Sequence, residues 1–167
     1  MPNIELTHRV GIASSAVMAC LAQTLADIAK KKEPYDDFSL KIDLGSLHIP
    51  NVATVMVPVT LHVGKHIGVP PSQTEIAIEA RDNTAYFPQF TGIIRADAAG
   101  ASATVLHLSG TYDVPGGMLG STLDRTVLAG AASASLSTFL QWLCETVEER
   151  IKHNEYETAR QMLHRHD

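Results

Sequence analysis

The chain has few of the residues that mark several large classes of protein. It contains only two cysteines and one tryptophan among its 167 residues, and aromatic residues make up 5%. Two cysteines are too few for the disulfide framework of a small secreted domain, and both occur among apolar neighbours. We therefore expect Cys20 and Cys144 to be buried, reduced thiols, which favours a cytoplasmic protein.

Positive charge and long apolar runs are also scarce. The 13 lysines and arginines are outnumbered by 18 acidic residues, so the net charge is −5 at pH 7 and no basic stripe is present. This balance argues against nucleic acid as a partner. No apolar run approaches the ~20 residues that span a bilayer, so we expect no transmembrane segment. Residues 9–22 weakly resemble a secretory signal, but helical spacing continues through Ile28 and favours a folded helix.

The sequence lacks the common motifs of catalysis and cofactor binding. It has no Gly-x-Ser-x-Gly motif, no glycine-rich phosphate loop with its lysine, and no closely spaced cysteine pair for an iron cluster. His62 and His66 have the spacing of a zinc-binding helix, but their segment has the pattern of a strand. We therefore expect neither a metal site nor a cofactor.

What the chain does contain is a clear order of helical and strand-like patterns. Residues 3–10 alternate apolar and polar positions, which predicts a half-buried strand, and a helix is predicted over residues 14–31. Several runs within residues 38–112 alternate with a period of two, which predicts five or six strands in sequential order. One long helix is predicted to begin near residues 118–121 and to end near Lys152.

This order predicts a single domain of the α+β class. Helices do not alternate with strands, so an antiparallel sheet with the helices segregated to it is favoured over a doubly wound parallel sheet. A chain of 167 residues suits one domain. We assign residues 1–153 to this domain and residues 154–167 to a polar tail that frays or adds a short surface helix.

The predicted last helix has a bare middle. Residues 129–135 (AGAASAS) contain no side chain larger than serine, whereas bulky apolar residues precede and follow them at helical spacing. A curled antiparallel sheet touches a long helix along a limited seam. The small residues therefore predict either an apolar cavity beneath this stretch, which we favour, or a tight approach of helix and sheet, which stays the alternative.

Two segments carry a resemblance to a known family. They are residues 87–92 (FPQFTG) and residues 110–125 (GTYDVPGGMLGSTLDR). The second is similar to the segment that leads into the last helix of many START-like, or SRPBCC, proteins: Gly-x-Tyr, a proline and glycine turn, then Leu-Gly-x-x-x-Asp. In element order the chain resembles this superfamily over residues 3–151. The resemblance implies a helix-grip fold, in which a curved antiparallel β-sheet wraps around a long C-terminal α-helix and another helix is inserted after the first strand.

The small-residue stretch and the resemblance together predict that the protein binds a small, largely hydrophobic ligand. A lipid, a sterol-like molecule or an aromatic, polyketide-like molecule would occupy a cavity between the sheet and the last helix. The residues expected to line this cavity are apolar positions of the strands and of the last helix. They are Val57, Val59, Leu61, Ile76, Ile78, Phe90, Ile94, Leu106, Leu108, Tyr112, Leu123, Val127 and Ala131.

The alternative is a cofactor-free enzyme of the polyketide cyclase, dehydratase or hydratase type, which would use polar pocket residues for acid–base catalysis. Its weak candidates are Tyr112, His107 and Arg95. Strand alternation predicts that Tyr112 shares a face with the apolar residues and that His107 and Arg95 lie opposite. The sequence leaves open whether a reaction is catalysed and whether the chain forms a homo-oligomer.

Overall fold

The computed structural model describes residues 3–30, 39–42, 55–68, 73–81, 89–113 and 125–163. The elements follow the predicted order of strand, helix, sequential strands and long helix. They are β1 (Asn3–Val10), α1 (Ser14–Lys30), β2 (Ser39–Ile42), β3 (Val55–Ile67), β4 (Gln73–Ala80), β5 (Gln89–Ala98), β6 (Thr104–Asp113) and α2 (Arg125–Leu163). The α+β class and the helix-grip arrangement are thereby confirmed.

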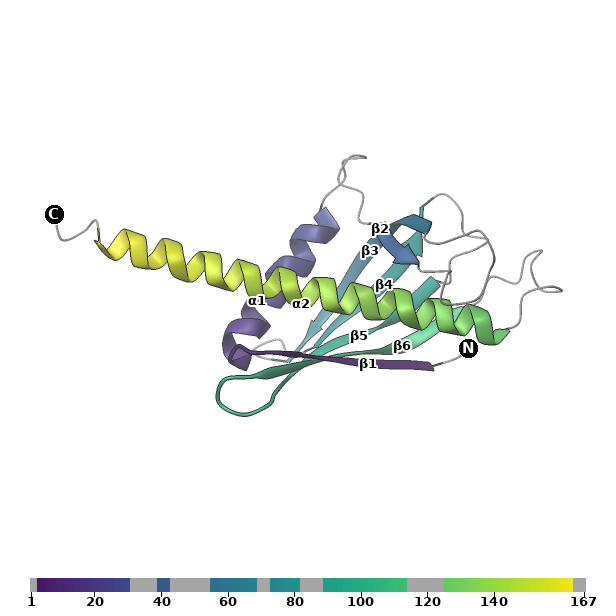
Figure 1. Cartoon of the computed structure of the whole chain (residues 1–167), viewed down its shortest axis with the longest axis horizontal. Helices are drawn as coiled ribbons and strands as arrows, with labels where there is room; N and C mark the ends of the chain where they lie inside the picture. Colours follow the sequence, from purple (N-terminus) through teal and green to yellow (C-terminus); the bar gives the residue numbers. More distant parts are fainter. Residues whose placement is uncertain are drawn as a thin grey trace.

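The six strands form one antiparallel sheet in the order β1-β6-β5-β4-β3-β2. Strands β2 to β6 follow one another as neighbours, and β1 closes the sheet beside β6 (Figure 1). Strand β3 pairs with β2 through Val55–Pro58 and with β4 through Val59–Ile67. Since residues alternate between buried and more exposed along β5 and β6, one face of the sheet is apolar.

Both helices pack against this apolar face, which we call the inner face. Helix α1 buries residues at helical spacing, and α2 does the same over its middle. Side chains from the two helices and from the strands form one hydrophobic core. Its largest fully buried members are Phe90, Phe139, Leu25, Ile78, Ile94, Leu106, Leu108, Leu136, Leu140, Leu143 and Val10.

Helix α2 is longer than predicted. It continues past the expected end at Lys152 to Leu163, so the predicted boundary is wrong and most of the supposed tail is helical. Residues 153–163 are polar but contain neither glycine nor proline, so nothing in them stops a helix. The predicted start near residues 118–121 lies outside the described residues. Within the part of the chain that the structure describes, neither helix has the length and apolar character needed to cross a membrane.

Strands β5 and β6 approach each other closely at a pair of glycines. Gly92 lies opposite Gly110 in the register of the two strands. A Cβ atom at either position would collide with backbone of the facing strand and with the ring of Phe90. The buried Phe90 ring thus occupies the volume that side chains would take at these two positions, and only glycine fits both.

Candidate ligand-binding site

Helix α2 lies close to both edges of the sheet. Its backbone comes close to β1 and β6 on one side and to β2 on the other, while among the described residues it has few close approaches to the central strands. Figure 1 shows α2 crossing in front of the sheet. Because an antiparallel sheet twists and curls, this arrangement leaves the inner face of the central strands to be covered by side chains or by a bound molecule.

The structure describes the side chains of nine predicted lining residues, and all nine are buried. Their exposed fractions are 0 to 5%, and they belong to the shared core. They are Val59, Leu61, Ile76, Ile78, Phe90, Ile94, Leu106, Leu108 and Tyr112. Leu123 lies outside the described residues, as do the side chains of Val57, Val127 and Ala131. The contact of these residues with a ligand stays a prediction.

The small-residue stretch of α2 turns part of its surface towards the sheet. Ala132 and Ser135 are buried, whereas Gly130 and Ala134 are exposed. The nine described lining residues are only 0 to 5% exposed, so other side chains of the protein cover them. Such cover is what the tight-packing alternative predicts. After Ser135, the residues of α2 that pack in the core are large, beginning with Leu136 and Phe139.

The three polar candidates do not meet in one site. Tyr112 is buried on the inner face, whereas Arg95 and His107 lie opposite each other on the outer face. A single catalytic site that combines Tyr112 with either of them is therefore wrong, because the sheet separates the groups. The alternation of the strands already indicated this separation.

Arg95 and His107 instead form a polar cluster with Asp97 on the outer face. Both Nε and Nη2 of Arg95 lie 2.8 Å from Oδ2 of Asp97, and Nε2 of His107 lies 3.2 Å from the same oxygen. The buried Nδ1 of His107 has no hydrogen-bond partner among the described residues. Sequence reasoning missed Asp97, although its spacing from Arg95 places both on one face of a strand. Recognising His107 as their neighbour requires the strand register.

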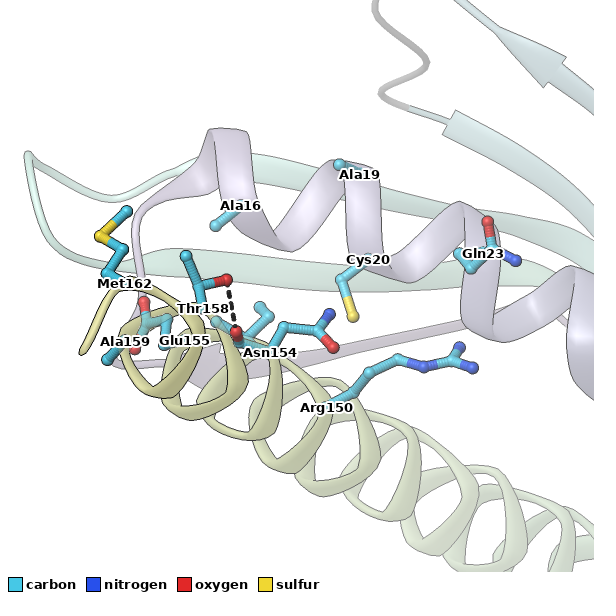
Figure 2. Close-up of a pocket in the computed structure, with 11 residues that line it drawn as sticks. Ala16, Ala19, Cys20, Gln23, Arg150, Asn154, Glu155, Thr158, Ala159 and Met162 are labelled. Carbon is cyan, nitrogen blue, oxygen red and sulfur yellow. Dashed lines mark hydrogen bonds between the residues drawn. The ribbon is translucent and has the colours of Figure 1, made fainter. Parts of the chain in front are cut away.

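A groove between α1 and α2 was also missed by sequence reasoning. It has a volume of about 700 Å³, and Figure 2 shows its two helical walls. Ala16, Ala19, Cys20 and Gln23 come from α1, and Arg150, Ile151, Asn154, Glu155, Thr158, Ala159 and Met162 come from α2. The groove forms between two helices that are far apart in the sequence. It can be found only when the packing of α1 against α2 is known.

Arg150 ties the two helices together at the narrow end of this groove. Its guanidinium donates hydrogen bonds to Oγ1 of Thr24, at 3.0 Å, and to Oδ2 of Asp27. The hydrogen bond and charge of Arg150 hold the pKa of the Asp27 carboxyl below its ordinary value. The Cys20 thiol, buried beside them, donates to the carbonyl of Val147.

A second hollow, of about 520 Å³, lies on β3, β4 and β5 beside His62 and Glu75. Nε2 of His62 is 3.6 Å from Oε2 of Glu79, and Nδ1 of His66 is 3.0 Å from Oγ1 of Thr74. Across the described ranges, no three histidine, cysteine or acidic residues are grouped so that they would hold a metal ion.

Comparisons with known proteins identify the fold. No protein-family model and no curated protein matches the chain. Among solved structures, a conserved protein from Geobacillus kaustophilus is 17% identical with a TM-score of 0.56, covering 89% of this chain and 96% of that chain. TTHA0849 from Thermus thermophilus is 15% identical with a TM-score of 0.54, covering 89% and 99%. Ara h 8.0201 is 12% identical with a TM-score of 0.53, covering 91% and 98%. Together with the order of the elements, these likenesses confirm the predicted α+β helix-grip fold of the chain.

Proposed function

We propose that the protein binds a small, largely hydrophobic molecule between the inner face of the sheet and the small-residue stretch of α2. The observation that carries this proposal is the grip of α2 on both edges of the sheet, with few close approaches to the central strands. Among the described residues, the buried side chains are apolar except for Thr24, Thr74, Thr104 and Ser135. A buried apolar surface with few polar groups favours a ligand of the same character.

The small residues of α2 indicate where such a molecule would enter. Moving Ala132 away from the sheet gives up little apolar contact, because burying one methyl group contributes about 0.8 kcal/mol. Moving a fully buried residue such as Phe139 would cost about 1.5–3 kcal/mol for that side chain alone. A guest is therefore accommodated at the lowest cost beneath the small-residue stretch of the helix.

The polar groups of the inner face define the ligand class. Tyr112 supplies one hydroxyl that would orient a polar end of the ligand. A lipid, a sterol-like molecule or an aromatic, polyketide-like molecule fits a site with so little polarity. The cyclase or hydratase alternative needs further acid–base groups there. Among the described residues, the other buried polar side chains are the hydroxyls of Thr24, Thr74, Thr104 and Ser135, which are poor proton donors and acceptors at neutral pH.

The proposal is tested by measuring thermal stability with a fatty acid, a sterol and an aromatic polyketide, with native mass spectrometry to detect the complex. A ligand present at 100 times its Kd adds about 2.7 kcal/mol to the stability. For a domain of this size, that raises Tm by roughly 5–11 °C. Failure of all three compounds both to raise Tm and to appear as bound mass would contradict the proposal.

A matched pair of variants locates the site. Ala132→Phe places a ring where we expect the ligand, because Ala132 is buried against the sheet, so the rise in Tm with the binding compound should disappear. Ala134→Phe adds the same ring on the exposed side of the same turn and should leave binding unchanged. Equal binding by the two variants would place the ligand elsewhere.

A further inference from the structure

Strand β1 lies at one end of the sheet, and one of its two sides is open. It pairs with β6 over its whole length, and among the described residues no strand pairs with its other side (Figure 1). No hydrogen bond joins that side to another part of the described chain. Alternate residues of an edge strand direct their N–H and C=O groups away from the sheet. We call this row of unpaired groups the free edge of β1.

The opposite end of the sheet is protected against pairing with another chain, whereas β1 is not. At that end β2 has only four residues, and the part of β3 beyond β2 follows Pro58 and carries Lys65 within a shift of register. Short strands, prolines, lysines and bulges all keep an edge from pairing. Strand β1 has eight residues, contains neither proline nor lysine, and keeps an unbroken register with β6. Its free edge is therefore open to a further strand.

The charged side chains of β1 favour a second copy of the same strand as that partner. On the outer face, β1 exposes one acidic residue, Glu5, and one basic residue, Arg9. Four residues of a strand span about 13 Å, so these two groups are too far apart to pair with each other. Neither forms an ion pair with another residue in the part of the chain that the structure describes. An identical strand running antiparallel supplies the opposite charge for both.

Two-fold symmetry leaves one register that pairs these charges. An axis perpendicular to the joined sheet keeps both outer faces on the same side. With this axis at Thr7, Glu5 lies directly opposite the partner's Arg9, and the same ion pair forms again on the other side of the axis. An axis at Leu6 or His8 would place Glu5 opposite an uncharged residue. The register centred on Thr7 also pairs residues 4–10, which is almost the whole strand.

We propose that two copies of the chain associate through the free edges of β1, as an antiparallel strand pair centred on Thr7. The pair forms about six to eight backbone hydrogen bonds. It also forms two ion pairs between side chains whose Cβ atoms are about 4.5–5.5 Å apart. Helix α2 packs on the inner face, where Ile4 and Val10 are buried, and the partner strand joins in the plane of the sheet. One strand pair buries less surface than a specific interface of standard size, so the dimer is weak and depends on concentration.

Two variants with an added cysteine test this arrangement directly. Thr7→Cys places two exposed thiols opposite each other at the axis, so mild oxidation of the concentrated protein should give a covalent dimer. Asn3→Cys is the matched control. Its thiol is exposed on the same face of β1 but lies about 26 Å from its counterpart, so it should not be cross-linked. The native cysteines, Cys20 and Cys144, are buried. Equal cross-linking of the two variants, or none with Thr7→Cys, overturns the proposal.

Sedimentation equilibrium of the full chain tests the charge pairing. From about 10 μM to about 500 μM, the wild type should shift from monomer towards dimer. Glu5→Arg and Arg9→Glu each place like charges opposite one another at both ion pairs, and each should weaken association by about tenfold. In an equimolar mixture of the two variants, opposite charges again face one another at both positions. A heterodimer should therefore form with affinity close to that of the wild type.

Glu149→Arg is the control for the change of charge. It alters the net charge by the same amount as Glu5→Arg at an exposed position of α2, and it should dimerise like the wild type. Circular dichroism verifies that all variants remain folded. A wild type that stays monomeric at every concentration overturns the proposal. A dimer that tolerates both charge reversals, or a mixture no stronger than either variant alone, also overturns it.

Discussion

Replacing Gly110 by alanine is expected to destabilise the fold strongly. The new Cβ atom would lie 2.6 Å from Cα of Gly92 and 2.8 Å from Cζ of Phe90, and it would collide with the carbonyl oxygen of Thr91. The ring of Phe90 can shift slightly, but the other two atoms belong to the backbone of β5. Because β6 is paired on both sides, with β1 and β5, it cannot move away without breaking hydrogen bonds. Overpacking typically costs 1–3 kcal/mol, and these backbone contacts place Gly110→Ala at about 3 kcal/mol.

Thermal and urea unfolding measure this loss. About 3 kcal/mol lowers Tm by roughly 6–12 °C in a domain of this size. Gly11→Ala is the matched control, since a Cβ there meets no atom within 4 Å, and its effect should stay below about 1 kcal/mol. Adding Phe90→Leu to Gly110→Ala should not restore stability, because the collision with Thr91 remains. If Gly110→Ala is as stable as Gly11→Ala, the close approach of the strands is refuted.

Two further predictions follow from charge and burial. Burial, followed by the charges of Glu148 and Glu145, raises the pKa of the Cys144 thiol to about 12, so at pH 8 it should react with a thiol reagent much more slowly in the native protein than in the unfolded chain. Rapid labelling of native Cys144 would contradict this. The lowered pKa of Asp27 means that its pairing with Arg150 stabilises the fold above the ordinary pKa of 3.8, and that this stabilisation is lost as the pH falls through the lower folded-state value. Wild type should therefore exceed Asp27→Asn in urea stability at pH 7, with the difference shrinking below about pH 4; a difference that stays constant down to pH 2 would refute the pairing.

The strands and the inner face could be predicted because their signal is local. Phe90 and Ile94 alternate with Gln89 and Arg95, and the structure buries the first pair while leaving the second more exposed. The same rule separates Tyr112 from its supposed catalytic partners. The alternation of buried and exposed residues along one strand can be predicted from that strand's own sequence, without knowing which strands lie beside it.

The parts that sequence reasoning missed depend on pairing between distant segments. Asp97 is joined to His107 only by the register of β5 and β6, and the groove beside Arg150 exists only because α1 diverges from α2. The end of α2 was placed too early for a different reason. An apolar stripe marks where a helix packs, and it disappears at Lys152 although the helix itself continues.

The packed middle of α2 should isolate the proposed ligand site from the end of the helix. Between the small residues near Ala132 and the turns beyond Lys152, the helix is fixed to the core by Leu136, Phe139 and Val147, each at most 2% exposed. A change at the end of the helix must cross this packed segment to affect the small residues. We therefore expect Arg160→Glu to leave the ligand-dependent rise in Tm unchanged. If Arg160→Glu abolishes that rise, the core segment of α2 transmits a change of position rather than holding the helix in place.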